Sequence, residues 1–419
     1  MGHGLFLNIP NASGHINPTL AVVHALTEAG EHITYYAGPE AQEAIERHGA
    51  LFAPYPDPMP FEGAGYHSVL EVGRAMVELT EQAMPLLYKL ADTKPDYVLF
   101  GNCCPWGKLL AEHLGVPSIC TTSTLVSTAP MVLGDPLLIL DLLPLARLPT
   151  LWGLYRRINA CRAQLGLRPR NPIAALIDIF RNEADLNLVF TLPAMQRGAA
   201  LLSKRYRFVG TSCELDRNSG MAFDRAWLAD DSLPLVYVSL GTIHNERPEF
   251  YHAVVEGLRT LSCRVLVATG PRFDPTSLAG SPEHIRLVPF APQLEVLQQA
   301  SVFISHAGMN SLNESLYFGV PLLLAPQTTE QAVNARRVRS LGAGLLLHRN
   351  PTPQQIRSGV ERLLQQERYR QQAQRLALDL RACGGAQAAA AAISALVGRD
   401  MTKPHLEIGA AATGGGHPH

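Results

Sequence analysis

Short apolar runs alternate with segments of helical spacing along most of the chain, and they do so in two separate blocks. The first block contains LFLNI, ITYYA, YVLFG and SICTT, and the second contains VYVSLG, RVLVATG, VFISHA and PLLLAP. Such alternation is typical of βαβ units, in which helices cover the faces of a parallel sheet. The pattern therefore predicts an α/β protein made of two Rossmann-like domains, each with a doubly wound parallel sheet.

The length of 419 residues supports two domains, because single hydrophobic cores stop growing near about 250–300 residues. A polar, turn-rich run after Cys213 ends in a proline just before the second block, as expected of a linker. We expect the following division: an N-terminal domain over 1–215, a linker over 216–232, a C-terminal domain over 233–380, a closing helix over 381–400 that packs back on the N-terminal domain, and a disordered tail over 401–419.

Charge and cysteine content narrow the class of partner. The formal net charge is −1 and no block of Lys and Arg is present, which argues against nucleic acid and anionic membrane surfaces. The seven cysteines show no metal-binding spacing, so we expect reduced thiols in a cytoplasmic protein. Small molecules are the expected partners, and a monomer or homodimer is the expected assembly.

The most apolar stretch, 129–155, contains acidic and basic residues and several prolines. These interruptions leave it short of the roughly 20 apolar residues that a membrane span requires. We expect the wall or lid of an apolar pocket instead, and no transmembrane segment. The N-terminus lacks the features of a signal peptide and is interpreted as a first strand.

A first motif, NASGHINPTL over 11–20, directly follows the first predicted strand. Ligands of doubly wound sheets bind outside the carboxyl ends of the strands, which is where this loop belongs. We expect Asn17 to cap a helix that runs to Ala29, with Pro18 in its first turn. His15 would then lie just before the helix, aimed into the cleft between the domains as a general base. A histidine that only stabilises the loop remains an alternative.

A second motif, FISHAGMNSLNESL over 303–316, leads from a strand through small residues into a helix. A helix N-terminus after Gly308 offers free N–H groups and a partial positive charge to a phosphate. His306 and Ser311 can donate to phosphate oxygens, and Glu314 can accept from a ribose diol. An ordinary strand–helix junction is the alternative.

Further candidates lie at other strand ends of the second block. Thr242 offers a hydroxyl to a phosphate, and Phe290 offers an aromatic face to a nucleobase. Glu330 and Gln331 open a helix, where they could bind sugar hydroxyls. Taken singly, each of these segments is equally compatible with a core strand, a turn or a helix first turn.

In their order and approximate spacing, GHINPTL, VSLGT, FAPQ, SHAGMNS and the final EQ pair resemble the bacterial macrolide-type glycosyltransferases of the inverting UDP-glycosyltransferase family. The resemblance extends over about residues 1–400. It implies a GT-B fold, with the acceptor in the N-terminal domain and the sugar nucleotide held mainly by the C-terminal domain, across a cleft. His15 corresponds to the general base of that family. The implied donor-binding residues are Gly14, Thr242, Phe290, Ala291, Gln293, His306, Gly308, Asn310, Ser311, Glu314, Glu330 and Gln331.

One position departs from the family. Where the family has an aspartate that pairs with the base histidine, this chain has Gly101, followed by Asn102. Loss of the orienting carboxylate in a serine-protease triad costs about 10⁴-fold in rate. We keep Asn102 as a candidate catalytic residue. Otherwise another carboxylate substitutes, the acceptor is acidic enough to need little help, or catalysis is weak.

The resulting hypothesis is an inverting glycosyltransferase that moves a hexose, glucose in preference, from a UDP- or dTDP-sugar to a hydroxyl of a polyketide, macrolide or phenolic acceptor. The nucleotide sugar is a co-substrate, and we expect no tightly bound cofactor and no metal. The alternative is a sugar-nucleotide-binding accessory protein with weak or no catalysis. Apolar residues expected to contact the acceptor are Phe61, Tyr66, Met84, Met131 and Leu137.

Overall fold

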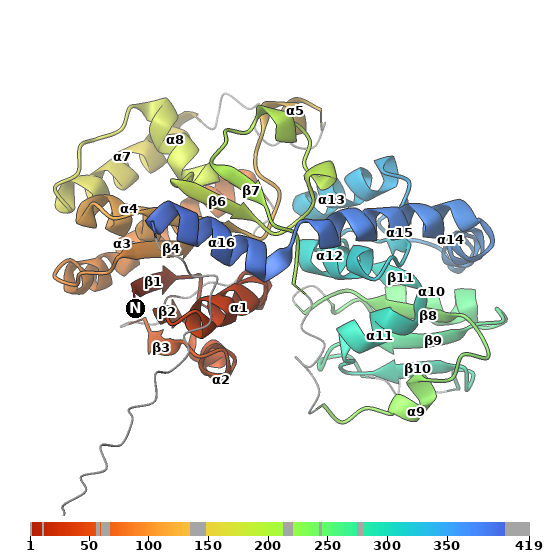
Figure 1. Cartoon of the computed structure of the whole chain (residues 1–419). Coiled ribbons are helices and arrows are strands. Elements are labelled where there is room, and N and C mark those ends of the chain that lie inside the picture. The colour runs from red at the N-terminus through yellow and green to blue at the C-terminus, as the bar shows by residue number, and fades with distance from the viewer. Residues whose placement is uncertain are drawn as a thin grey trace, which may run out of the picture.

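Two α/β domains lie side by side in the computed structural model (Figure 1). The structure describes residues 2–10, 12–55, 59, 68–134, 148–212, 221–242, 245–274, 278 and 280–398. All the strand pairs of its two sheets are parallel. The expected fold class, an α/β protein with two doubly wound parallel sheets, is confirmed.

The first sheet has seven strands in the order β3-β2-β1-β4-β5-β6-β7. Their bounds are β1 His3–Leu7, β2 His32–Ala37, β3 Leu51–Pro54, β4 Tyr97–Gly101, β5 Ser118–Thr122, β6 Leu186–Val189 and β7 Tyr206–Phe208. The strand order reverses between β1 and β4, and open α/β sheets bind ligands at such a switch point. His15 follows β1 and Asn102 follows β4, so both belong to this edge of the sheet.

The second sheet has six strands in the order β10-β9-β8-β11-β12-β13. Their bounds are β8 Leu235–Ser239, β9 Arg264–Ala268, β10 Ile285–Val288, β11 Ala300–Ser305, β12 Leu322–Leu324 and β13 Gly344–Leu346. Here the order reverses between β8 and β11. Thr242 follows β8 and His306 follows β11, so the second domain presents its motifs at its own switch point.

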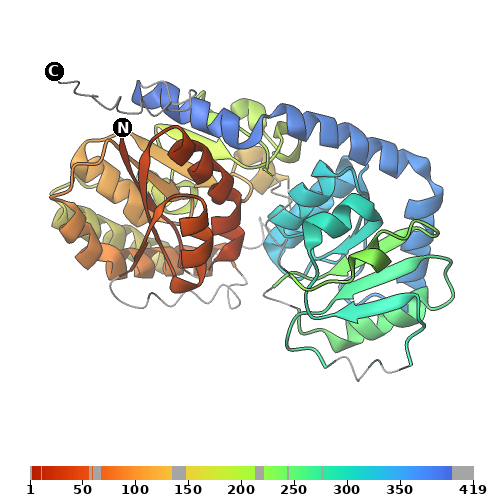
Figure 2. The ribbon, with the colours of Figure 1, turned by 60° about the horizontal axis from the view of Figure 1, so that its bottom comes forward.

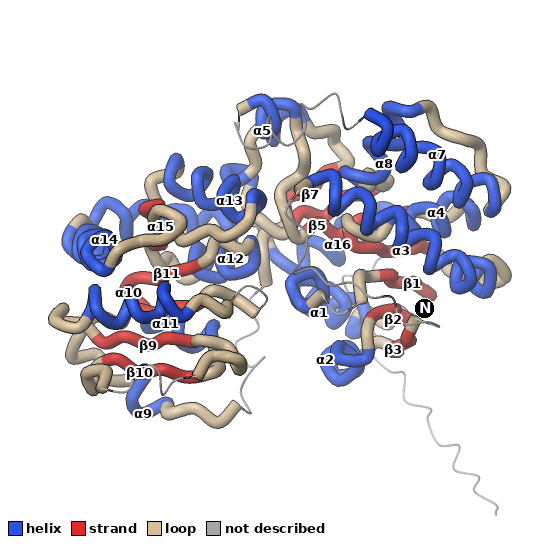
Figure 3. Tube along the Cα trace, turned by 180° about the vertical axis from the view of Figure 1, so that it is seen from behind, coloured by secondary structure: helices blue, strands red, loops and turns tan. Residues whose placement is uncertain are grey.

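Helices cover both faces of each sheet (Figure 3). In the first domain α1, α2 and α16 pack on one face, and α3, α4, α7 and α8 pack on the other. In the second domain α12, α13 and α15 lie on one face, opposite α10 and α14. The helix bounds are α1 Ser13–Glu28, α2 Gln42–Arg47, α3 Val69–Leu90, α4 Pro105–Leu114, α5 Ala129–Leu133, α7 Leu148–Gln164, α8 Pro172–Arg181, α9 Arg225–Leu228, α10 Pro248–Leu258, α11 Gln293–Gln299, α12 Met309–Tyr317, α13 Thr329–Ser340, α14 Pro353–Gln365, α15 Glu367–Ala382 and α16 Gly385–Val397.

Helices α15 and α16 pass over both domains (Figure 2). The run Glu367–Val397 is long and apolar enough by composition to cross a membrane. It is not a membrane span, because it breaks into two helices at Gly384, whose φ of +87° favours glycine. After the break, the backbone N–H of Gly385 donates to the carbonyl of Val209 at 2.7 Å. Helix α16 then packs against α1 and β6, so the end of the described chain lies on the first domain.

Helix α1 begins four residues earlier than the expected start at Asn17. Its first residue is Ser13, and Pro18 lies inside the helix. His15 is therefore in the first turn rather than ahead of it. Because proline has no N–H, the carbonyl of Gly14 has no donor four residues along the helix. That carbonyl is free to bond outside α1.

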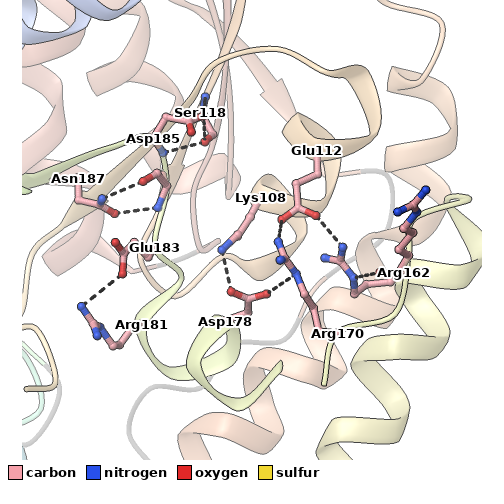
Figure 4. Close-up of polar contacts among 12 residues, drawn as sticks. Lys108, Glu112, Ser118, Arg162, Arg170, Asp178, Arg181, Glu183, Asp185 and Asn187 are labelled. Carbon is pink, nitrogen blue, oxygen red and sulfur yellow. Dashed lines mark hydrogen bonds and ion pairs between the residues drawn. The ribbon is translucent and has the colours of Figure 1, made fainter. Parts of the chain in front are cut away.

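Charged side chains fix α7 and α8 to α4 in the first domain (Figure 4). Lys108 binds Asp178 at 2.7 Å, and Glu112 accepts from Arg162 at 2.8 Å and from Arg170 at 3.0 Å. Although burial alone raises the pKa of Glu112, the two guanidinium groups hold it below its ordinary value. The network anchors the helices that flank the acceptor side of the domain.

Several expectations concern residues outside those that the structure describes. They are the linker over 216–220, the end of the closing segment at 399–400, the tail over 401–419, and the acceptor candidates Phe61, Tyr66 and Leu137.

We predict that Asn313→Ala lowers stability through the contact between the domains. The side chain is 1% exposed; its Nδ2 donates to the carbonyl of Phe190 at 2.7 Å and its Oδ1 accepts from the Thr191 hydroxyl at 2.8 Å. A buried polar group left unpaired costs about 1–3 kcal/mol, so the melting temperature should fall. Thermal denaturation measures the effect. Gln298→Ala, at an exposed position, is the control, and equal melting temperatures for the two variants would contradict the prediction.

Candidate active site at the domain junction

The two sequence motifs that carry the functional hypothesis meet between the domains. Asn310, in the first turn of α12, donates from Nδ2 to the carbonyl of Gly14 at 2.8 Å. This carbonyl is the one that Pro18 leaves without a donor inside α1. Helix α1 lies on the side of its domain that faces the second domain (Figure 2). The first turns of α1 and α12 are therefore held against each other, with His15 beside the contact.

The N-terminus of α12 is suited to an anion. Its N-cap, Gly308, has no side chain to bond the first N–H groups, which also lack acceptors within the helix. Their partial positive charge favours phosphate oxygens. His306 lies just before the helix, and its imidazole occupies the space next to Gly241, where a Cβ atom would stand 2.7 Å from the ring. Gly241 thus permits the ends of β8 and β11 to pack closely.

Polar groups along α12 continue from this helix end. Glu314 is 6% exposed, and its Oε2 accepts from Nε2 of Gln293 at 2.5 Å. Gln293 also lies 3.4 Å from the Ser311 hydroxyl and accepts from Tyr237 at 3.3 Å. Phe290, in contrast, is 51% exposed. A buried carboxylate and an exposed aromatic ring are the groups that a ribose and a nucleobase require.

The start of α13 lies next to α12. Gln331 completes a capping box, because its Oε1 accepts from the backbone N–H of Gln327 at 2.8 Å. Its amide NH₂ is then the group that could donate to a sugar hydroxyl. Glu330 is exposed and accepts from Asn334 at 3.3 Å, while surrounding protein raises the pKa of its carboxyl by reducing hydration of the charge. Burial, Cys120 and then Glu330 raise the pKa of Cys103 to about 12, which places Glu330 near the segment after β4.

The imidazole of His15 has a neutral partner. Its Nδ1 lies 3.0 Å from the hydroxyl oxygen of Ser123, which directly follows β5 and is 6% exposed. The protein around the ring disfavours the charged form and lowers the pKa of His15 to about 4. No carboxylate among the described residues contributes to this shift.

Asn102 does not take the place of the missing aspartate. Its amide donates to the Thr124 hydroxyl at 3.2 Å, and the described residues show no hydrogen bond between Asn102 and His15. Gly101 cannot be replaced simply by the absent carboxylate, because a Cβ atom there would lie 2.6 Å from Oδ1 of Asn8. The expectation that Asn102 orients the base is wrong for these contacts.

Of the described acceptor candidates, Met84 on α3 is buried in the core of the first domain, at 5% exposure. Met131 on α5 packs with Val333 on α13, so α5 reaches the second domain beside the start of α13. Figures 1 and 3 both show α5 near α13.

Ser123 and Asn8 are the site residues that sequence reasoning missed. Both follow predicted strands directly, and that position was the available signal. Asn8 is fully buried, and its Nδ2 donates to the Tyr35 hydroxyl at 2.8 Å and to the backbone carbonyl of His15 at 3.2 Å.

The chain is similar to known proteins over nearly its whole length. Residues 255–396 match the family model of the erythromycin biosynthesis protein CIII-like C-terminal domain. The NDP-glycosyltransferase YjiC of Bacillus subtilis is 31% identical, with 94% of this chain and 97% of that protein covered. Demethyllactenocin mycarosyltransferase of Streptomyces fradiae is 28% identical, with 95% and 87% covered.

A solved structure agrees with these relatives. The glycosyltransferase of kitacinnamycin superposes with a TM-score of 0.82 at 25% identity, covering 94% of this chain and 99% of that one. Two parallel-sheet domains whose switch points meet, together with these similarities, show that this enzyme has the GT-B fold and belongs to the natural-product glycosyltransferases of the macrolide type.

Proposed function

We propose that the enzyme transfers a hexose, glucose in preference, from a UDP- or dTDP-linked donor to a hydroxyl of a hydrophobic small molecule, with inversion at the anomeric carbon. The observation that supports this most directly is the hydrogen bond between Asn310 and Gly14. It sets the phosphate-binding end of α12 beside His15, so that leaving group and base can act on one sugar carbon.

The diphosphate of the donor would bind at the first turn of α12, with help from His306 and Ser311. Charge that develops on the leaving oxygens is then met by backbone N–H groups that are already oriented. Glu314 would accept from the ribose diol, and Phe290 would stack on the base. Glu330 and the NH₂ group of Gln331 would contact sugar hydroxyls, which favours a fully hydroxylated hexose over a deoxysugar.

In the transfer step, Nε2 of His15 takes the proton of the acceptor hydroxyl. The acceptor oxygen forms a bond to the anomeric carbon, while the bond from that carbon to the phosphate oxygen breaks and its electron pair leaves with the nucleoside diphosphate. Attack from the face opposite the leaving group inverts the configuration. The base and the phosphate-binding helix come from different domains, so the proposed reaction needs both.

The proposal is tested by incubating the protein with UDP-glucose or dTDP-glucose and a panel of phenols and macrolides. Product with the anomeric configuration opposite to that of the donor is expected. His15→Ala should lower kcat/KM about 10²- to 10⁴-fold, the usual range for a general base. His24→Ala, an exposed histidine of the same helix, is the matched control and should keep full activity. Tight UDP binding without turnover on any acceptor would contradict the proposal.

We predict that kcat/KM stays constant from pH 8 down to about pH 5 and falls only as pH approaches 4. His15 must be neutral to accept a proton, and its lowered pKa of about 4 shifts the loss of activity to more acidic solution. The measurement is kcat/KM for an acceptor that does not itself ionise in this range, with circular dichroism to establish that the chain stays folded. An acid limb near pH 6.5 would mean that the ring is as basic as free histidine.

We also predict that Gly101→Asp fails to raise turnover and lowers the melting temperature. Its Cβ would displace Asn8, which holds the backbone of His15. Gly153→Asp is the control, because the space at that helix position is open. A gain in kcat with an unchanged melting temperature would show that the new carboxylate fits beside the base.

A further inference from the structure

The environment of His15 bears on which acceptor the site can use. The ring bonds Ser123 through Nδ1, and the polar groups around it are neutral: the Ser123 hydroxyl after β5, the Asn8 amide after β1 and the Asn310 amide on α12. Burial is the cause of its pKa shift, with no contribution from an ionised group of the described residues. The base therefore lacks a counter-charge.

The neighbouring strand end offers no room for such a charge. Asn8 fills the space at Gly101, where its Oδ1 accepts from the N–H of Ile9 at 2.9 Å and its Nδ2 donates to Tyr35 and to the carbonyl of His15. This amide is fully buried and bonded on both sides. The neutral surroundings of His15 are thus part of the packing of the domain.

A hydroxyl partner can still orient the imidazole. When Nδ1–H donates to the Ser123 oxygen, the proton of the neutral ring is fixed on Nδ1, and Nε2 carries the lone pair that a base needs. The hydroxyl stabilises the imidazolium that forms after proton transfer much less than a carboxylate would. The ring is oriented, but it remains a weak base.

We propose that Ser123 is the positioning residue of His15, and that the enzyme consequently prefers acidic acceptor hydroxyls, such as those of phenols, over aliphatic alcohols. This inference rests on the proposed function. The proton balance is unchanged: the acceptor proton moves to Nε2, and the acceptor oxygen replaces the diphosphate oxygen at the anomeric carbon. An acidic hydroxyl already carries much of its negative charge as the bond forms, so a weak base suffices.

The test compares acceptors of graded acidity with one nucleotide sugar. The series runs from a nitrophenol, ionised at the assay pH of 8, through phenol, whose pKa is near the tyrosine value of about 10, to benzyl alcohol. For the unmodified enzyme, kcat/KM should be at least about 100-fold lower with benzyl alcohol than with phenol. Ser123→Ala should lower kcat/KM about 10-fold with phenol and less than about twofold with the nitrophenol, which needs no base.

Ser123→Thr, which keeps the hydroxyl, should restore most of the activity with phenol. Thr124→Ala removes the adjacent hydroxyl, which bonds Asn102 instead of His15, and should behave like the unmodified enzyme. A purely structural role for Ser123 would lower all acceptors alike and lower the melting temperature.

That uniform loss, or benzyl alcohol turned over within about threefold of phenol, would overturn the inference while leaving sugar transfer itself established. Absence of transfer to every acceptor in the series would instead reject the proposed function, and the inference with it.

Discussion

The hydrogen bond from Asn310 to the carbonyl of Gly14 joins the first turns of two helices that come from different domains. It exists because Pro18 removes the N–H that would otherwise bond this carbonyl within α1. Four residues from Asn310, Glu314 lies buried on the same helix, and Asn313 between them fixes α12 to the segment after β6. The orientation of α12 toward His15 thus depends on two amide side chains of one helix.

The same arrangement explains how a phosphate site can adjoin a histidine. A cationic imidazole is disfavoured where protein replaces water, and burial lowers the pKa of His15. The positive potential at the junction comes instead from the uncapped start of α12. Leaving-group stabilisation and proton abstraction are therefore assigned to different elements, and the base stays neutral beside the helix end.

Strand periodicity and strand ends carried most of the predictable information. Both sheets could be expected from alternating apolar runs, and residues such as His306 and Thr242 follow strands at the points where the sheet order reverses. The start of α1 could not be placed, since Pro18 suits a first turn and also fits inside the helix once its neighbour's carbonyl bonds another domain. Ser123 was missed because a serine after a strand has no distinguishing pattern of its own.

The sequence by itself determined the two α/β domains, because the period of apolar residues selects strands and helices and places loops at their carboxyl ends. It also contained the residues of a phosphate-binding helix start. Only the tertiary structure decided which side chain meets His15. Ser123 reaches the ring from β5 because Asn8 fills the space at Gly101, and such a choice depends on packing between segments about 100 residues apart, which no local pattern encodes.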